Sequence, residues 1–249
     1  MFNPEERARL RSDLLEHAAG DPRISGAAIT GSAAAGREDR WSDIDLAFGI
    51  HNADELPRIL GDWTAHMYGR HGALHHLDVK SGAWTYRVFL LASTLQVDLA
   101  FVHAEDFRAL RPTFRLVAGK ANEPRHISPP EAAQLIGLGW LYALHARSCI
   151  ARGRLWQAKY MISGVRDHAL ALACLRRGLP TSEGRGFDSL PKEVAAQFEG
   201  AIVRRLEPEE LLRAFRAVVS GLLEEIHAAD AELAEQLRGA LMELTELPL

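Results

Sequence analysis

The sequence predicts an α+β protein, with a sheet in its N-terminal half and helices in its C-terminal half. Between residues 20 and 120, short runs rich in Val, Leu, Ile and aromatic residues alternate with turn residues, which is typical of strands. Beyond residue 130, apolar residues recur with the period of an α-helix. The helix-breaking stretch Ser128-Pro129-Pro130 separates the two patterns. We therefore expect two domains, 1–125 with a mixed sheet and flanking helices, and 126–249 with a helical bundle.

The N-terminal domain should open with an amphipathic helix from Pro4 to about Ala19, which Gly20-Asp21-Pro22 brings to an end. A second helix is expected over about 53–68. Strands are expected at 24–30, 43–50, 74–79, 85–91, 95–102 and 115–118. The fourth and fifth of these strands form a hairpin, because only a short turn separates them.

The C-terminal domain should consist of helices, since the apolar period continues to the end of the chain. They are expected at about 130–152, 154–177, 208–228 and 231–244, with a loop around 181–188. Between Leu211 and Leu223, Leu, Val and Phe form a broad apolar stripe. Its width suits a buried core and a dimer face equally, so the stripe is compatible with a monomer and with a homodimer.

Composition and charge limit the kinds of partner. Apolar residues make up 47% of the chain and charged residues 25%, which is ordinary for a globular protein. Residues 1–125 carry 15 Lys and Arg against 17 Asp and Glu, and the remainder carries 14 against 16. A protein that follows long nucleic acid normally needs a strip of cations to neutralise phosphates. Long nucleic acid is therefore disfavoured as a partner.

Cysteine usage and the apolar runs favour a cytoplasmic protein that does not enter a membrane. Cys149 and Cys174 lie in helical patterns, too far apart for a zinc cluster or redox pair, and are expected to be buried thiols. The polar, acidic N-terminus lacks the apolar core of a secretion signal. The longest apolar run, from Leu135 to Leu144, is too short to span a bilayer.

The residues that indicate chemistry are Gly31-Ser32 and, after ten further residues, Asp43-Ile44-Asp45 at the start of a strand. Because strand side chains alternate between faces, Asp43 and Asp45 should project from the same side, about 7 Å apart. Two such carboxylates are costly to bury without a cation, and their oxygens suit Mg²⁺ held jointly with phosphates. Gly31 permits close approach of a phosphate where a helix begins, and Ser32 adds a hydroxyl donor.

A third acid, Asp98, lies in the middle of the strand at 95–102, flanked by aliphatic residues. Solvation gives no reason for an acid there. If this strand neighbours that of Asp43, three carboxylates converge on one patch, enough for two metal ions or for a base beside them. In the alternative interpretation, Asp43 caps a turn, Asp45 faces solvent and Asp98 pairs with an arginine such as Arg87.

This pattern resembles the nucleotidyltransferase superfamily of the DNA polymerase beta type, and within it the antibiotic nucleotidyltransferases that adenylylate aminoglycosides or lincosamides. The family signature is a Gly-Ser turn, a gap of about a dozen residues, an Asp-x-Asp pair on a strand, and a later acid on a neighbouring strand. The matching residues are Gly31, Ser32, Asp43, Asp45 and Asp98. The resemblance covers about residues 20–105 and extends to the helical remainder, where family members carry a domain that closes over nucleotide and acceptor.

The resemblance implies a transferase that moves a nucleoside monophosphate from a nucleoside triphosphate, by default ATP, onto a hydroxyl of a small acceptor, and hence a role in antibiotic resistance. It implies that Asp43 and Asp45 hold Mg²⁺. Asp98 would be a third ligand or the base, and the base is favoured because an acceptor alcohol must lose a proton as it attacks the α-phosphate. The active site would lie in the cleft between the domains.

The second domain offers further candidates for binding. Lys159 suits a triphosphate tail, or is a solvated lysine on a helix face. Arg166 and Asp167 share the helix face of Lys159. They are expected either to contact nucleotide or acceptor, or to form Arg–Asp ion pairs between helices. Arg185 and Asp188, in the loop at 181–188, are candidate acceptor contacts. Three aromatic residues suit stacking on a base or sugar, although burial in the core is favoured: Trp140, Tyr142 and Trp156. Three histidines without acids at ligand spacing are interpreted as surface or packing residues: His71, His75 and His76.

Three other functions stay open. An enzyme that modifies a protein side chain or an RNA end, as toxin-like relatives do, would be favoured by a basic groove, and the balanced charge argues against it. A non-catalytic nucleotide sensor would be expected to lose acids, and all three are present. A structural helical partner would show an exposed heptad seam within residues 208–244.

Overall fold

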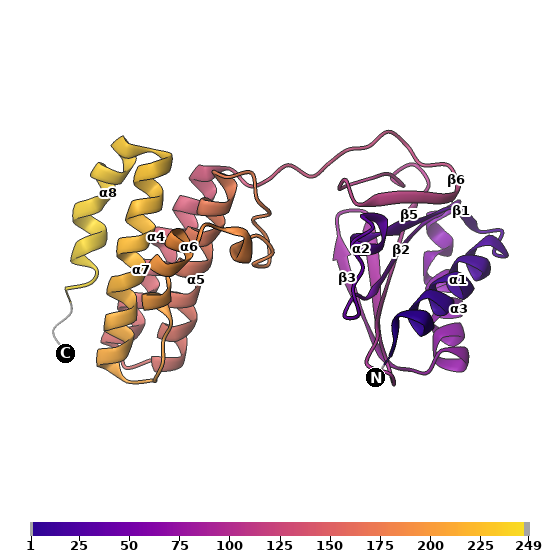
Figure 1. The fold of residues 1–249 in the computed structure, drawn as a ribbon, viewed down its shortest axis with the longest axis horizontal. Helices are drawn as coiled ribbons and strands as arrows, with labels where there is room; N and C mark the ends of the chain where they lie inside the picture. Colours follow the sequence, from indigo (N-terminus) through magenta and orange to yellow (C-terminus); the bar gives the residue numbers. More distant parts are fainter. Residues whose placement is uncertain (1, 247–249) are drawn as a thin grey trace. The chain divides into compact units, whose positions relative to one another are not determined.

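Two compact units make up the chain, the first reaching to Ile127 and the second starting at Ser128. The computed structural model describes residues 2–246 (Figure 1). The predicted α+β class is confirmed, because the first unit holds a six-stranded sheet with flanking helices and the described part of the second unit is helical. Within the described residues, none of the helices combines the length and apolar character needed to cross a bilayer.

The sheet of the first unit is mixed and has the strand order β3-β4-β5-β2-β1-β6. Its elements are α1 (Pro4–Ala19), β1 (Ile24–Thr30), α2 (Gly31–Ala34), β2 (Ile44–Ile50), η1 (Ala53–Glu55), α3 (Leu56–Arg70), β3 (Ala73–Ser81), β4 (Trp84–Leu91), β5 (Gln96–His103) and β6 (Phe114–Gly119). The central strands β2 and β5 are parallel, whereas the other neighbours are antiparallel. The expected hairpin of β4 and β5 is confirmed.

One face of the sheet carries the main core of the first unit. Helices α1 and α3 cover this face (Figure 1). The rings of His17 on α1 and Trp63 on α3 are in contact. The buried side chains that β2 and β5 direct at these helices are Ile44, Leu46, Phe48, Ile50, Val97, Leu99 and Phe101. Since strand side chains alternate, the residues between them face the opposite side. A smaller cluster there contains Ala47 and Ala100.

The second unit packs its helices around one apolar core. Its elements are α4 (Ala132–Ala151), α5 (Leu155–Leu175), η2 (Phe187–Ser189), α6 (Lys192–Gln197), η3 (Glu199–Ala201), α7 (Pro208–Ala229) and α8 (Ala231–Glu243). The apolar stripe from Leu211 to Leu223 is buried in this core. Cys149 and Cys174 are buried free thiols, as predicted.

Besides shifts of one or two residues at other element ends, the structure departs from the sequence-based expectations at Asp43 and in the segment after residue 188. Asp43 lies one residue before β2, which starts at Ile44, so the predicted start of that strand was one residue too early. The short elements α6 and η3 follow the loop at 181–188 and were not predicted. A helix of six residues is too short to display a full apolar period, which explains the omission.

Candidate active site

Three carboxylates gather on the sheet face opposite α1 and α3. The parallel register of β2 and β5 sets Asp45 directly beside Asp98, and Asp43 precedes β2 by one residue. One carboxylate oxygen from each of the three residues lies within 4.8 Å of the others. Among residues 2–246, no other set of three His, Cys, Asp or Glu side chains is grouped closely enough to hold a metal ion. The strand neighbourhood on which the sequence interpretation depended is therefore present.

The electrostatic cost of this grouping falls on Asp98. The pKa of its carboxyl is raised to about 6, mainly by burial and in part by the nearby charge of Asp43, against the lowering effect of a hydrogen bond from Gln96. In that bond, Nε2 of Gln96 donates to Oδ1 of Asp98 over 3.0 Å. Like charges that share a partly desolvated site resist ionisation unless a cation compensates them. We call these three acids the acidic centre, and a cation bound there would relieve the cost that Asp98 bears.

A tight turn from β1 into α2 lies against the acidic centre. Gly31 adopts a left-handed backbone with φ of +63°, and a Cβ placed there would lie 1.9 Å from Oδ2 of Asp45. Only glycine allows the backbone and this carboxylate to approach so closely. The next residue, Ser32, has a buried hydroxyl oxygen without a hydrogen-bond partner. Burying an unsatisfied hydroxyl costs about 1–3 kcal/mol, so this turn carries an unused polar group beside three acids.

These residues fit a hard divalent cation held together with a phosphate. Mg²⁺ prefers oxygen ligands and is commonly bound through one or two carboxylates plus substrate phosphates. Asp43, Asp45 and Asp98 would supply the carboxylate oxygens, while the hydroxyl of Ser32 is free to meet a phosphate oxygen. The set contains only oxygen groups, which disfavours a thiolate-type or imidazole-type metal site here.

The alternative pairing of Asp98 with Arg87 is wrong. Arg87 lies on β4 and forms a two-pronged pair with Asp78 of the neighbouring strand β3, over 2.6 and 2.7 Å. The same guanidinium also donates to the carbonyl of Leu60 and to the hydroxyl of Thr64. The cation that could have neutralised Asp98 is thus engaged on α3 and the edge of the sheet.

The charged candidates of the second unit lie mainly on α5. Lys159 is exposed on this helix. Arg166 pairs with Asp167 over 2.7 Å, so the expected ion pair exists between neighbours on one helix and does not link two helices. Arg185 pairs with Glu183 in the exposed loop, and Asp188 lies on η2. Binding of nucleotide or acceptor by these residues stays a prediction.

The favoured burial of the second-unit aromatic residues is wrong for both tryptophans. Trp156 is 76% exposed on α5 and Trp140 is 36% exposed on α4. Both lie off the buried stripes of their helices, which smaller aliphatic residues fill. Tyr142 is half-buried, and its ring packs on Gly164 where a Cβ would clash at 2.1 Å. It neighbours the exposed Tyr160, which the sequence analysis did not single out.

Five histidines of the first unit lie in two groups. His17, His66 and His71, here called the histidine cluster, lie between α1 and the end of α3. The rings of His17 and His66 stack at 3.8 Å, and the Nε2 atoms of His66 and His71 are 3.1 Å apart. Burial lowers the pKa of all three, that of His66 to about 4. The second group is a pair on β3, where His75 is exposed and His76 contacts the Tyr68 hydroxyl.

Comparison with known proteins leaves the family open. No protein-family model and no curated protein matches the chain. One similar solved structure is an aminoglycoside 6-adenyltransferase from Bacillus subtilis, with a TM-score of 0.41 and 14% identity over 97% of this chain and 99% of that one. Another is the polymerase core of TRAMP, an RNA surveillance complex, with a TM-score of 0.31 and 14% identity over 98% and 82% of the two chains. Because these scores and identities are low, the function is inferred below from the acidic centre.

Proposed function

We propose that this chain is a nucleotidyltransferase that uses a divalent cation, Mg²⁺ by default, to transfer a nucleoside monophosphate from ATP or another nucleoside triphosphate to a hydroxyl of a small acceptor. The observation that carries the proposal is the grouping of Asp43, Asp45 and Asp98 within 4.8 Å, with Asp45 and Asp98 on adjacent parallel strands and Asp43 just before β2. The left-handed Gly31 and the unpartnered hydroxyl of Ser32 support it, since they lie beside the acids and suit a phosphate. We extend it to aminoglycoside or lincosamide acceptors from the sequence resemblance alone.

The roles of the residues follow from their chemistry. Asp43 and Asp45 would hold the cation, which when bound neutralises charge on the carboxylates and on the phosphates of the donor. Gly31 lets the donor approach the backbone, and Ser32 donates its hydroxyl hydrogen to a phosphate oxygen. Asp98 accepts the proton of the acceptor hydroxyl, a task for which a carboxyl with a raised pKa is suited.

The transfer itself balances without a further reactant. The acceptor oxygen forms a bond to the α-phosphorus while the bond from that phosphorus to the bridging oxygen of the β-phosphate breaks. Pyrophosphate leaves with the electron pair of the broken bond. The hydroxyl proton passes to the carboxylate of Asp98 and from there to solvent.

The experiment that tests this proposal measures pyrophosphate release. The chain is incubated with Mg²⁺ and each of the four common nucleoside triphosphates, together with panels of aminoglycosides and lincosamides. Asp45→Asn should lower the rate at least about 100-fold, since removal of one charge-stabilising group at an active site has effects of this size. Glu105→Gln removes a charge from a side chain that is 88% exposed in the turn after β5 and should leave the rate unchanged.

Three outcomes would redirect the proposal. Release that persists in Asp45→Asn would show that the acidic centre is not the reactive site. Release only when proteins or RNA ends replace the antibiotics would assign the chain to the toxin-like class of acceptors. Absence of release with every donor, together with nucleotide binding, would identify a nucleotide sensor.

Lys159 of the second unit is proposed to contact the triphosphate tail, because a flexible ammonium suits a phosphate chain. Its exposure on α5 leaves the ammonium available. Lys159→Met should therefore raise KM for the nucleotide while the melting temperature stays constant. An unchanged KM would assign Lys159 to the solvated surface.

A further inference from the structure

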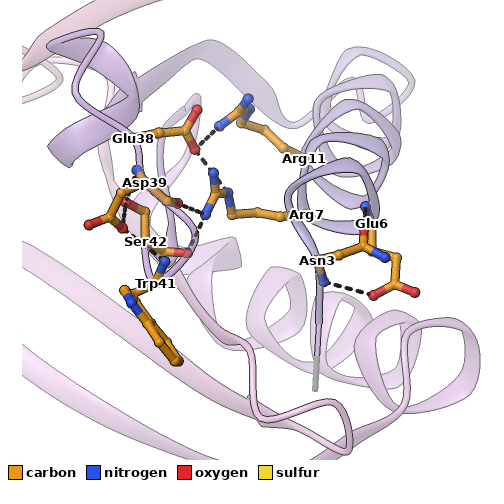
Figure 2. A network of polar contacts seen from close by, with 8 residues as sticks. All are labelled: Asn3, Glu6, Arg7, Arg11, Glu38, Asp39, Trp41 and Ser42. Carbon is orange, nitrogen blue, oxygen red and sulfur yellow. Dashed lines mark hydrogen bonds and ion pairs between the residues drawn. The ribbon is translucent and has the colours of Figure 1, made fainter.

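Arg7, near the start of α1, is a charged residue with only 4% of its surface exposed. Figure 2 shows its guanidinium directed from α1 at the segment 38–42, which leads into the acidic centre. Its Nη1 donates to the carbonyl of Asp39 over 2.6 Å and to the carbonyl of Ser42 over 2.9 Å. A buried guanidinium is costly unless it is hydrogen-bonded, and here both bonds end on this one segment.

The same segment is tied to α1 by a second cation and is folded on itself. Oε1 of Glu38 lies 3.1 Å from Nε of Arg7 and 2.5 Å from Nη1 of Arg11 (Figure 2). Within the segment, the amide of Trp41 donates to Oδ1 of Asp39 over 2.8 Å, and the amide of Asp39 donates to Oγ of Ser42 over 2.9 Å. The segment is thus a compact turn anchored to the helix at both ends.

The position of Asp43 gives this anchor a consequence for the site. Asp45 and Asp98 lie on strands and are held by the ladder between β2 and β5. Asp43 precedes β2, and the paired positions of β2 begin at Ile44. The carbonyl that Arg7 binds on Ser42 belongs to the peptide that joins Ser42 to Asp43. Fixing that peptide restricts the backbone of Asp43 directly.

We propose that Arg7 is a positioning residue for the metal centre, which places Asp43 beside the two acids that the sheet holds. The inference rests on the proposed function, in that it takes the acidic centre to bind a divalent cation. Arg7 touches neither the cation nor the substrates and acts through the backbone of residues 38–42. Replacing a residue that orients a metal ligand without touching the metal typically weakens metal binding by about 10–100-fold.

The first test measures Mn²⁺ binding to the whole chain from the electron paramagnetic resonance signal of the free ion. Arg7→Met keeps an unbranched apolar stem and removes the guanidinium with its charge and both hydrogen bonds, and should weaken Mn²⁺ binding about tenfold. Arg7→Lys keeps the charge and a nitrogen that can donate to both carbonyls, but its side chain is shorter than that of arginine and lacks the Nε that lies beside Glu38, so we expect a smaller loss. Arg9→Met, at an exposed position of the same helix, should leave binding unchanged.

The second test asks whether the segment itself is released. Trypsin cleaves after arginine, and Arg37 and Arg40 flank or lie in the anchored segment and are exposed. Mass spectrometry should show faster cleavage at these two positions in Arg7→Met than in Arg9→Met. The melting temperature and circular dichroism of each variant show whether the fold is intact. If Arg7→Met does not fold, Arg7→Lys decides the question.

The outcomes separate this inference from the proposed function. Wild-type protein that binds no Mn²⁺ would refute the metal centre and with it both proposals. Wild-type protein that binds Mn²⁺ but transfers no nucleotide would refute the proposed reaction and leave the role of Arg7 measurable. Folded Arg7 variants with wild-type Mn²⁺ affinity would overturn the inference even if transfer is established.

Discussion

Replacing Asp98 by Asn should stabilise the metal-free protein at neutral pH. Asn has the shape of Asp and retains an oxygen that can accept the hydrogen bond from Gln96. The carboxyl has a pKa of about 6 instead of an ordinary 3.8, mainly because it is buried. One pKa unit corresponds to about 1.36 kcal/mol, which gives at most roughly 3 kcal/mol for this carboxyl. Since Asp98 is partly exposed, solvent screening reduces the expected gain to about 1–2 kcal/mol.

The pH dependence fixes the sign of this effect. The folded protein holds the proton of Asp98 more tightly than the unfolded chain does, so protonation of this group favours folding. Its contribution is fully present below pH 3.8 and is lost as the pH rises through about 6. Wild-type protein and Asp98→Asn should therefore have similar stability at about pH 3.5 and diverge by pH 7.5.

Differential scanning calorimetry in the presence of EDTA measures this difference. At pH 7.5 the gain should raise the melting temperature by roughly 2–8 °C. Glu105→Gln, which removes an exposed charge, serves as the control for net charge and should shift the transition little at either pH. A lower or equal melting temperature for Asp98→Asn at pH 7.5, or the same difference at both pH values, would refute the assignment of an electrostatic penalty to Asp98.

The remaining predictions concern the turn, the metal ligands and two outlying features. Gly31→Ala should abolish Mn²⁺ binding because its Cβ would collide with Asp45. The control Gly36→Ala has a similar φ of +64° and open space around it, so it should bind Mn²⁺ normally and lose only the stability that backbone strain costs. Equal loss of binding in both variants would contradict the contact between Gly31 and Asp45. Mn²⁺ titration of Asp45→Asn should show at least about tenfold weaker binding, and wild-type affinity would exclude this carboxylate as a ligand. His66 should contribute a loss of stability as the pH falls from about 6.5 to 4, opposite in sign to the contribution of Asp98, because the unfolded chain takes up a proton on His66 that the folded chain resists. Urea titrations of His66→Gln at pH 5 and pH 7.5 check this, since the variant should be less sensitive to that change. Trp156→Ala should change the free energy of unfolding by less than about 0.5 kcal/mol because the ring is 76% exposed, and a larger loss would mean that the ring packs in the core.

The strands that carry the acids could be predicted from sequence because both alternate clearly. Ile44, Leu46 and Phe48 point one way along β2, which leaves Asp45 on the other face, and Asp98 stands in the same relation to its aliphatic neighbours. In such strands the aliphatic residues face the core and the acid faces the opposite side of the sheet, so the direction of both acids follows from the alternation. The pairing of β2 with β5 had to be assumed, since the two strands are far apart in the sequence and their neighbourhood depends on the whole sheet.

Other features left no readable signal. Arg7 lies in an amphipathic helix among exposed charges, and its burial depends on where the turn at 38–42 packs, which periodicity does not reveal. Gln96 could have been found, because it lies two residues before Asp98 on the same strand and so faces the same side. The exposure of Trp156 was missed because a large aromatic residue in a helical pattern was assigned to the core, although its neighbour Ala158 fills the buried position.

The stability cost of the acidic centre is itself informative about function. The same sheet face carries Ala47 and Ala100 on the two strands that hold Asp45 and Asp98, so a small apolar side chain could occupy either acidic position in this scaffold. Such a replacement at position 98 would remove the charge penalty. The buried hydroxyl of Ser32 would still lack a hydrogen-bond partner. Two separate unfavourable features thus occur in one place, and one ligand that combines a divalent cation with phosphate oxygens would relieve both. A ligand that binds only the folded state would stabilise the chain in proportion to its concentration over its Kd. Mg²⁺ and a nucleoside triphosphate added together should therefore raise the melting temperature more than the sum of their separate effects, and simple additivity would mean that the acids and the Gly31-Ser32 turn do not serve one site.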